Sequence, residues 1–326
     1  MKVWVVGGAG YIGSHVCKAL IKAGHEPVVF DNLSTGLRSN VLPGIPFREG
    51  DILDLPVLRA AAREFRFDGV VHLAALKAAG ESMEVPERYS RANIVGSLNL
   101  LESVLEAGIP NFVFSSTAAV YGEPQYLPLD EKHSTKPENY YGHTKLAIEG
   151  FIEWYGRLKG LKHVCLRYFN AAGADPEGEL GERHDPETHL IPLVLQAASG
   201  RRPHIQVFGR DYDTPDGTCI RDYIHIQDLC SAHWLGLQAL LQKGGCQAYN
   251  LGNGQGFSVQ EVIDTAERVT GRKIPVIDAP RRAGDPARLV ADARRAREQL
   301  GWQPQYADLD TIVAHAWRWE QQGAPG

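Results

Sequence analysis

The sequence feature that most constrains the fold is a glycine-rich turn near the start of the chain. Residues 7–13 read Gly-Gly-Ala-Gly-Tyr-Ile-Gly and separate an apolar run at 2–7 from a stretch with helical periodicity at 11–23. A second apolar run follows at 26–31. This order of strand, turn, helix and strand is the first unit of an α/β fold, and it limits how the rest of the chain can be arranged.

The spacing of the glycines predicts a dinucleotide-binding turn. Gly7 permits a tight turn, Gly10 lets the backbone approach a pyrophosphate, and Gly13 allows close packing of the helix. The backbone N–H groups at the start of the helix, around Tyr11 and Ile12, then meet the anion. A glycine repeat alone is weak evidence, because glycines also serve ordinary turns.

Asp31 strengthens this prediction because it closes the second strand, where a carboxylate accepts the adenosine ribose hydroxyls. With Asn32 beside it and no arginine directly after, it favours NAD over NADP, although Arg38 lies nearby. Asp51 and Ile52 follow the third predicted strand and are placed to meet the adenine, although Asp51 could also be a turn residue. Further cofactor contacts are expected after the fourth strand, at Leu73, Ala74, Ala75 and Lys77.

Helical and strand patterns continue to alternate along the chain. Helices are predicted at 55–65, 92–107, 141–158, 190–199, 228–241, 258–270 and 309–320, and strands at 69–73, 111–115, 163–168, 248–251 and 275–278. We therefore expect a Rossmann-type doubly wound parallel sheet with a smaller mixed α/β C-terminal substrate domain. The predicted boundary gives an NAD-binding domain at 1–170 and a substrate-binding domain at 171–326, and leaves open whether later segments return to the first.

Composition and charge exclude several classes of protein. The 326 residues carry a formal net charge of −5, which gives no electrostatic footprint for nucleic acid. No segment predicts a signal peptide or a membrane span, so we expect a cytoplasmic protein. The five cysteines form no metal-binding or disulfide pattern. His184 and His189 lie near acidic residues in what we expect to be a solvated loop, and no metal is predicted.

Tyr141 and Lys145 form the most informative pair for chemistry. Residues four apart share a helix face, so a phenol and an ammonium can meet the same ligand. The lysine charge and the positive ring of an oxidised nicotinamide would lower the pKa of the phenol and let Tyr141 act as a general base. The alternative is an ordinary helix with a packed tyrosine and a solvated lysine. Thr117 follows the fifth strand, at the sheet edge where open parallel sheets bind ligands.

Four motifs give the chain a resemblance to the extended short-chain dehydrogenases/reductases, and among these to the UDP-glucose (UDP-galactose) 4-epimerase family. They are Gly-Gly-Ala-Gly-Tyr-Ile-Gly-Ser at 7–14, Phe-Ser-Ser-Thr-Ala-Ala-Val-Tyr-Gly at 114–122, Leu-Arg-Tyr-Phe-Asn at 166–170 and Asp-Gly-Thr-Cys-Ile-Arg-Asp-Tyr-Ile-His at 216–225. Their order and spacing cover nearly the whole chain.

The resemblance implies a role for each site residue. Tyr141 is the acid/base, Lys145 tunes it and holds the nicotinamide ribose, and Thr117 binds the reacting sugar hydroxyl. Further cofactor contacts are implied at Asn93, Ser115 and Tyr168. Contacts to the UDP-sugar are implied at Asn170, Leu190, Arg221, Arg282, Asp285 and Leu289.

The implied reaction interconverts UDP-galactose and UDP-glucose through a transient 4-keto sugar, with bound NAD storing the hydride. Ala118 and Ala119 stand where related dehydratases and decarboxylases carry acids. Leu289 aligns with a tyrosine that narrows the sugar pocket in some relatives, so we expect some activity on UDP-GalNAc and UDP-GlcNAc. Two alternatives remain open: a 4-epimerase of another nucleotide sugar, such as an acetamido sugar or uronic acid, and a non-enzymatic NAD-sensing regulator. The resemblance also implies a homodimer, in which the helices at 92–107 and 141–158 would pair across a two-fold axis.

Overall fold

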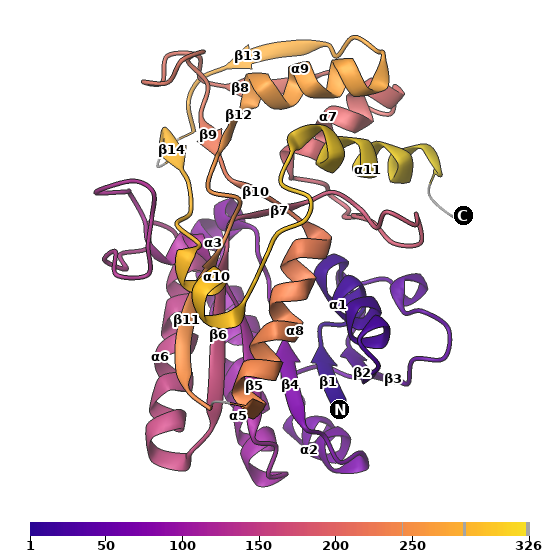
Figure 1. The fold of residues 1–326 in the computed structure, drawn as a ribbon, viewed down its shortest axis with the longest axis vertical. Coiled ribbons are helices and arrows are strands. Elements are labelled where there is room, and N and C mark those ends of the chain that lie inside the picture. The colour runs from indigo at the N-terminus through magenta and orange to yellow at the C-terminus, as the bar shows by residue number, and fades with distance from the viewer. Residues whose placement is uncertain (243, 283–284, 324–326) are drawn as a thin grey trace.

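The computed structural model, which describes residues 1–242, 244–282 and 285–323, is built on a parallel sheet in the order β11-β6-β5-β4-β1-β2-β3 (Figure 1). Its strands are β1 (Lys2–Val6), β2 (Glu26–Asp31), β3 (Phe47–Glu49), β4 (Gly69–His72), β5 (Asn111–Thr117), β6 (Lys162–Tyr168) and β11 (Cys246–Leu251). The strand order reverses between β1 and β4, which opens a crevice at the carboxyl ends of the strands. The predicted Rossmann-type fold class is confirmed.

Helices cover both faces of this sheet, which explains why the strands are apolar without alternation. Val3 and Val5 of β1 face the cluster that includes α1 (Tyr11–Lys22) and α8 (Ile226–Gln242). Trp4 and Val6 face the opposite cluster, formed with α2 (Leu55–Glu64), α5 (Gly96–Glu106) and α6 (Tyr140–Lys159).

The helix predicted at 92–107 is wrong in its first turns. The chain instead forms α3 (Ala79–Glu84), α4 (Pro86–Tyr89) and a π-helical stretch η2 (Ser90–Val95) before α5 begins. The wide turn contains Asn93, whose amide is fully buried and bonds outside its own helix. Such π segments often lie at functional sites.

The C-terminal half of the chain returns to the large sheet. Strand β11 pairs in parallel with β6, with Leu251 opposite Tyr168, while α8 packs on α1 and on β5 and β6. Helix α10 (Arg294–Leu300) packs against α8 and β11. The domain boundary at residue 170 therefore stays a prediction. Segments that follow it in the sequence complete the large sheet on the cofactor side.

The smaller lobe packs three helices around its own apolar core (Figure 1). These helices are α7 (Leu190–Ser199), α9 (Val259–Thr270) and α11 (Leu309–Gln321). Its short strands are β7 (Asn170–Ala172), β8 (Ile205–Phe208), β9 (Ile220–Arg221), β10 (Tyr223–His225), β12 (Phe257–Ser258), β13 (Val276–Ala279) and β14 (Arg288–Leu289). None of the helices in the described ranges combines the length and apolar character needed to cross a membrane.

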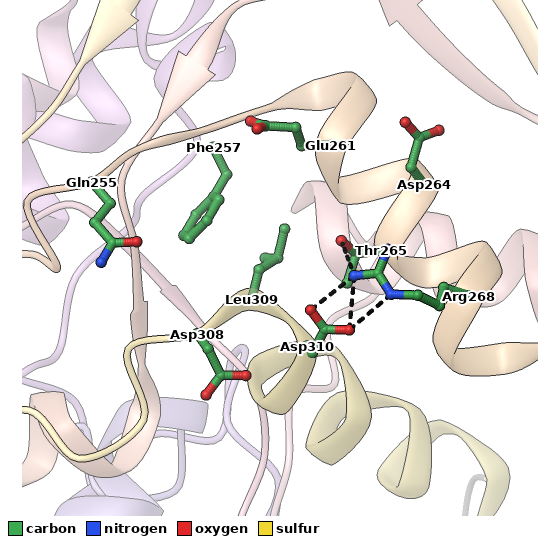
Figure 2. Close-up of a pocket in the computed structure, with 9 residues that line it drawn as sticks. All are labelled: Gln255, Phe257, Glu261, Asp264, Thr265, Arg268, Asp308, Leu309 and Asp310. Carbon is green, nitrogen blue, oxygen red and sulfur yellow. Dashed lines mark hydrogen bonds and ion pairs between the residues drawn. The ribbon is translucent and has the colours of Figure 1, made fainter.

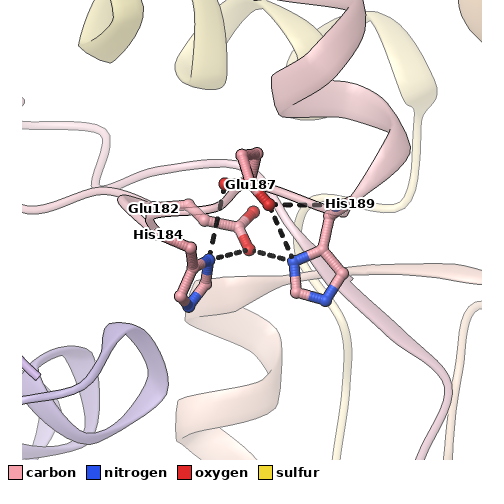
Figure 3. Close-up of side chains that lie close together, drawn as sticks. All are labelled: Glu182, His184, Glu187 and His189. Carbon is pink, nitrogen blue, oxygen red and sulfur yellow. Dashed lines mark hydrogen bonds and ion pairs between the residues drawn. The ribbon is translucent and has the colours of Figure 1, made fainter. Parts of the chain in front are cut away.

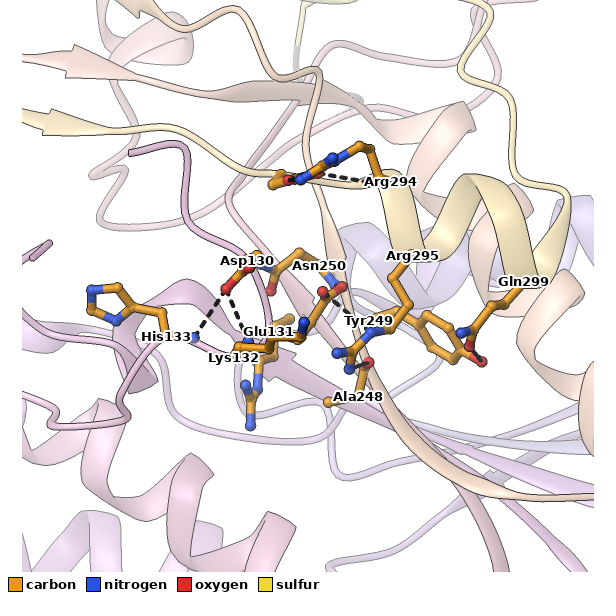
Figure 4. A network of polar contacts seen from close by, with 12 residues as sticks. Asp130, Glu131, Lys132, His133, Ala248, Tyr249, Asn250, Arg294, Arg295 and Gln299 are labelled. Atoms are coloured by element: carbon orange, nitrogen blue, oxygen red, sulfur yellow. Dashed lines mark hydrogen bonds and ion pairs between the residues drawn. The ribbon is translucent and has the colours of Figure 1, made fainter. Parts of the chain in front are cut away.

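A loop between the short helix η3 (Ala118–Val120) and α6 is fixed against the far edge of the large sheet (Figure 4). The backbone N–H of Asn250 donates to Glu131 at 2.8 Å, and the Asn250 amide donates to the carbonyl of Leu129 at 2.8 Å. The N–H of Asp292 donates to the same Leu129 carbonyl at 2.7 Å. These bonds hold the segment after β14 beside the turn that follows β5.

Candidate active site

Tyr141, Lys145 and Thr117 converge at the carboxyl edge of the sheet, as predicted for the protein's chemistry. Thr117 ends β5, and Tyr141 and Lys145 lie one turn apart at the start of α6. A Cβ at Gly142 would lie 2.5 Å from the carbonyl oxygen of Ala119, so only glycine lets α6 begin this close to the turn after β5. The Thr117 hydroxyl hydrogen-bonds the Tyr141 phenol.

The protein alone does not produce the phenolate that the sequence predicted at Tyr141. Burial raises the pKa of Tyr141 to about 12, and the hydrogen bond from Thr117 offsets only part of this effect. The expectation of a lowered pKa included the charge of the bound nicotinamide, so it stays a prediction for the site with its cofactor. A lower pKa requires positive charge near the phenol, from the charged form of Lys145 and from the bound nicotinamide.

Lys145 is buried and held by the strand beneath it rather than by Tyr141. Its Nζ donates to the carbonyl of Ser115 at 2.8 Å and lies 6.0 Å from the centre of the Tyr141 ring. Burial lowers the pKa of Lys145 to about 7, against the opposing effect of the Glu149 carboxylate. At neutral pH this lysine is poised between its charged and neutral forms.

Behind Tyr141, Lys145 and Thr117 lies a buried ion pair that the sequence reasoning missed. Glu149, one turn after Lys145, accepts hydrogen bonds from Arg167 on β6 and from Ser116 on β5. Arg167 also donates to the hydroxyl of Tyr121 at 3.1 Å. The sequence contains one signal for Glu149. It lies four residues after Lys145, the same spacing that places Lys145 on the helix face of Tyr141.

The glycine turn has the geometry of an anion-binding site. Gly7 has a φ of +88°, and a Cβ there would lie 2.5 Å from the backbone N of Ala74. A Cβ at Gly13 would lie 2.2 Å from the Gly7 carbonyl oxygen, so the helix rests directly on the turn. Among the described residues, no side chain caps α1 at Gly10, and the amides around Tyr11 and Ile12 are left for a ligand. The turn therefore fits a dinucleotide pyrophosphate.

Asp31 lies beside this turn at the end of β2. Its carboxylate accepts hydrogen bonds from the N–H of Ala9 at 2.9 Å and from the N–H of Leu33 at 2.8 Å. Burial raises the pKa of Asp31, against the lowering effect of these two bonds. Asn32 donates to Asp51 at 2.8 Å, which links the ends of the second and third strands. Ile52, next in the chain, is buried.

Asn93 connects the segment after β4 to the catalytic helix. The N–H of Leu76 donates to its side-chain oxygen at 2.8 Å, and its NH₂ donates to the carbonyl of Leu76 at 3.0 Å and to Thr144 at 3.1 Å. This arrangement fixes the turn of Leu73, Ala74 and Ala75 against α6. At the neighbouring strand ends, the hydroxyls of Ser115 and Tyr168 bond each other.

Three of the expected UDP-sugar contacts lie together in the smaller lobe. Arg221 ends β9, Leu289 pairs with it on β14, and the Asp285 carboxylate forms an ion pair with the Arg221 guanidinium. Leu289 packs against the cluster containing Ala118, next to Thr117. Asn170, at the start of β7, bonds the carbonyl of Asp222 through both its N–H and its side chain.

Arg282 lies close in the chain to the ion pair of Arg221 and Asp285, and its carbonyl accepts the N–H of Asp285 at 3.4 Å. The Arg282 guanidinium lies on the surface, 3.9 Å from the centre of the Phe208 ring. The expected contact of Arg221 and Arg282 with the diphosphate stays a prediction. Leu190 begins α7, directly after His189.

The expectation of a solvated loop around His184 and His189 is wrong. Both histidines point their Nδ1 atoms toward Glu182 and Glu187, and these two glutamate side chains are only 5% exposed (Figure 3). His184 Nε2 also lies 2.9 Å from the Nζ of Lys77, an expected cofactor residue. The loop thus reaches the edge of the cofactor site.

A separate hollow between α9 and α11 does not belong to this site (Figure 2). It is lined by Phe257 and Leu309 together with acidic side chains, and the ion pair of Arg268 with Asp310 lies at its side. The sheet edge contributes no lining residue to it among the described ranges. We therefore assign no chemistry to this hollow.

Comparison with known proteins agrees with this geometry. The model of the NAD dependent epimerase/dehydratase family matches residues 3–252. The chain belongs to this family, whose match includes the glycine turn, Thr117, Tyr141 and Lys145.

Within this family, the chain is similar to UDP-glucose 4-epimerases over its full length. The curated UDP-glucose 4-epimerase of Halalkalibacterium halodurans is 49% identical, with 100% of this chain and 97% of the relative covered. The crystal structure of UDP-glucose 4-epimerase from Brucella ovis in complex with NAD is 49% identical, with a TM-score of 0.95 and 97% of each chain covered. The enzyme from Stenotrophomonas maltophila, solved with bound NAD and formylated UDP-arabinopyranose, is 42% identical, with a TM-score of 0.95, 99% of this chain and 98% of that chain covered.

Proposed function

We propose that this chain is an NAD-dependent 4-epimerase that interconverts UDP-galactose and UDP-glucose. The observation that carries the proposal is the meeting of Tyr141, Thr117 and Lys145 at the sheet edge, beside the glycine turn. The similarity of the whole chain to UDP-glucose 4-epimerases supports it. A regulator without activity would have no need for a complete set of these three groups.

The chain's own residues supply proton transfer and positioning. NAD held on the glycine turn would supply a reversible hydride acceptor for the sugar C4. Tyr141 takes the proton of the 4-hydroxyl in one half of the cycle and gives it back in the other. The Thr117 hydroxyl bonds the Tyr141 phenol and, in this proposal, also the oxygen of the sugar 4-hydroxyl. The charged form of Lys145 favours the phenolate of Tyr141. Without its ligands, the protein raises the pKa of this phenol to about 12.

The cofactor position rests on the first lobe. Gly7, Gly10 and Gly13 accommodate the pyrophosphate, and Asp31 receives the adenosine ribose. A carboxylate at this place repels a 2′-phosphate and so favours NAD. The remaining cofactor contacts in the proposal are Tyr11, Ile12, Asn32, Asp51, Ile52, Leu73, Ala74, Ala75, Lys77, Asn93, Ser115 and Tyr168.

Epimerisation, rather than elimination, follows from what surrounds Thr117. Ala118 and Ala119 offer neither an acid nor a base to the keto sugar, and Ala118 belongs to an apolar cluster. The ketone therefore returns to the alcohol. The nucleotide is held by the smaller lobe, through Asn170, Leu190, Arg221, Arg282 and Asp285 in our proposal. Binding energy far from the reacting carbon then keeps the sugar in the site while it turns.

The sugar specificity is broader than glucose and galactose in this proposal. Leu289 lies on β14 against the cluster that contains Ala118, close to the turn that begins at Thr117. A leucine leaves more room there than a tyrosine, so an N-acetyl group at C2 is admitted. UDP-GalNAc and UDP-GlcNAc are therefore included as slower substrates.

A homodimer formed through α5 and α6 and a cytoplasmic location complete the proposal. Trp154 and Leu158 on α6 are 58% and 70% exposed, unusually open for such large apolar side chains. Burying them against the same helices of a second copy would give a two-fold symmetric interface. Fractionation of the source cells would test the location.

The deciding experiment is a product assay on purified protein with UDP-galactose and no added cofactor. Formation of UDP-glucose without net change in redox state is expected, because the hydride is returned in each cycle. Accumulation of an oxidised sugar, or conversion only with stoichiometric NAD, would contradict the proposal. Parallel reactions with UDP-GalNAc and a UDP-uronic acid distinguish the alternative epimerases.

A further inference from the structure

Four metal-ligating side chains converge in the loop that leads from β7 to α7. Glu182, His184, Glu187 and His189 come from one short segment and turn toward a common centre (Figure 3). Their ligand atoms all lie within 4.8 Å of one another. Glu182 and Glu187 are 5% exposed, His184 is 15% exposed and His189 is 40% exposed. The centre is therefore partly shielded from water by its own ligands.

The two buried carboxylates require positive charge. In the described part of the chain, their ion-pair partners are the two histidines, and neither carboxylate pairs with a lysine or arginine. The nearby acidic group of Asp175, Glu177 and Glu179 is different, because the ammonium of Lys18 lies 2.6 Å from each of the three. In the Glu182 cluster the positive charge has to come instead from the two histidines, from Lys77 beside His184, or from a bound ion.

The distances within the cluster are close to those of a tetrahedral metal site. His184 Nδ1 lies 3.2 Å from Glu182 and 3.4 Å from Glu187, and His189 Nδ1 lies 3.5 Å from Glu187. Four ligands at about 2.1 Å from a zinc ion are separated from one another by about 3.4 Å. One contact, from His189 Nδ1 to Glu182 at 2.5 Å, is a direct hydrogen bond that has to open by about 1 Å to reach this geometry.

We infer that Glu182, His184, Glu187 and His189 bind a divalent transition-metal ion of the zinc class, which holds the loop between the two lobes. Two imidazole nitrogens with two carboxylate oxygens suit zinc and its neighbours in the first transition row, whereas magnesium and calcium prefer oxygen ligands only. Four protein ligands close the coordination shell, which is typical of a structural site and leaves no open position for catalysis.

The position of the site gives the metal a defined structural role. His189 directly precedes Leu190, where α7 begins, and the ring of His184 packs edge-on near Tyr11 at the cofactor turn. An ion bound here would rigidify the loop that leads into α7, beside the edge of the first lobe. The ion also changes the surroundings of Lys77. A His184 that binds metal through Nδ1 carries its hydrogen on Nε2, so Nε2 can no longer accept a hydrogen bond from the Lys77 ammonium. Lys77 is then free to turn toward the cofactor side.

The test is metal binding to the untagged full-length protein after treatment with EDTA. A Cys246→Ser background removes the exposed thiol as a competing ligand. Titration with ZnCl₂ by calorimetry is expected to give one equivalent of tight binding. Titration with Co²⁺ is expected to give the visible absorption bands of tetrahedral cobalt. Neither measurement depends on activity.

His184→Ala and Glu187→Gln are expected to weaken Zn²⁺ binding by about 100-fold or more, since even outer-shell changes cost 10- to 100-fold. Glu177→Gln, in the neighbouring acidic group that pairs with Lys18, is the matched control and should bind as before. Zn²⁺ should also raise the melting temperature of the unmodified chain and not that of His184→Ala. An unmodified protein that takes up no Zn²⁺ or Co²⁺, or variants that bind as tightly as the control, would overturn the inference in favour of a proton-linked cluster.

Discussion

Glu149 and Arg167 form a buried ion pair one helical turn beyond Lys145. Arg167 Nε donates to the two carboxylate oxygens of Glu149 at 2.9 and 3.2 Å, and Ser116 donates to the same carboxylate. The pair joins α6, β5 and β6 immediately behind Thr117. It therefore fixes the elements that carry the catalytic side chains.

Glu149→Gln is expected to move the pH dependence of activity. Glu149 raises the pKa of Lys145, which burial lowers to about 7, so removing the carboxylate charge lowers this pKa further. The charge on Lys145 is present below its pKa and lost above it, so the alkaline limb of kcat/KM should move to lower pH. Arg167 is left without its counter-charge, and stability should fall by about 3–5 kcal/mol.

The control for this change is Glu153→Gln, which breaks an exposed pair with Arg157 one turn further along α6. It should leave both the pH profile and the stability nearly unchanged. An alkaline limb that stays in place in Glu149→Gln would mean that the carboxylate does not act on Lys145.

Tyr141→Phe is expected to lower kcat by about 10²- to 10⁴-fold, the usual contribution of a positioned acid/base group. Binding of UDP should be preserved, because the substitution removes only the hydroxyl. Steady-state assays with UDP-galactose measure the effect. Tyr140→Phe is the matched control, since the Tyr140 hydroxyl contacts Ser90 at 2.6 Å instead of Thr117. Equal rates in the two variants would remove Tyr141 from the mechanism.

Acid is expected to destabilise the fold through buried neutral histidines. Burial, together with the Lys145 charge, lowers the pKa of His72 to about 3, and burial lowers that of His233 to about 4. The unfolded chain binds these protons near pH 6.5 and the folded chain does not, so stability falls as pH decreases below that value. From pH 7 to 5.5 each histidine costs about 1 kcal/mol.

Urea unfolding of His72→Asn at both pH values tests this prediction. The variant should lose about 1 kcal/mol less than the unmodified chain over this interval. His143→Asn, at an exposed position, should lose as much as the unmodified chain. The same loss in both variants would show that the buried imidazole at position 72 is not the cause.

Leu289→Tyr is expected to narrow the sugar site. Because Leu289 packs beside Ala118, a tyrosine there should reduce kcat/KM for UDP-GalNAc at least 10-fold relative to UDP-galactose, about 1.4 kcal/mol of discrimination. Paired assays of both substrates give the ratio. If the unmodified chain already turns over UDP-GalNAc only at background level, the proposed breadth of specificity is wrong.

The exposed apolar residues of α6 are expected to lie in a dimer interface. Trp154→Glu combined with Leu158→Glu should convert a dimer into a folded monomer, measured by analytical ultracentrifugation and circular dichroism. Ile277→Glu changes an exposed apolar residue of the smaller lobe and should leave the dimer intact. A sedimentation profile that is monomeric before any substitution would contradict the proposed assembly.

The fold of the first lobe was predictable because its elements are long and strongly patterned. The strand at 26–31 begins and ends where the sequence placed it, as does the helix at 190–199 in the smaller lobe. The short strands of the smaller lobe, such as β9 (Ile220–Arg221), were missed because pairs of residues carry no periodic signal. The π turn before α5 was missed because its sequence continues an ordinary helical pattern.

The candidate site was predictable where the residues lie on patterned elements, as with Tyr141 and Lys145. Burial could not be read from the sequence, and burial is the reason that the pKa of Tyr141 rises to about 12. The loop with His184 and Glu187 was mistaken for a solvated one because its composition is polar. Only the three-dimensional path of the loop brings these side chains together and shields them.

The return of α8 and β11 to the large sheet affects how this protein can be taken apart. A fragment ending at residue 170 would expose the unpaired edge of β6 and the apolar surface that α8 covers, and such edges promote aggregation. The cofactor half is thus not a portable module. Chimeras that exchange sugar-binding regions with relatives need to keep residues 226–251 with the parent that supplies the first strands.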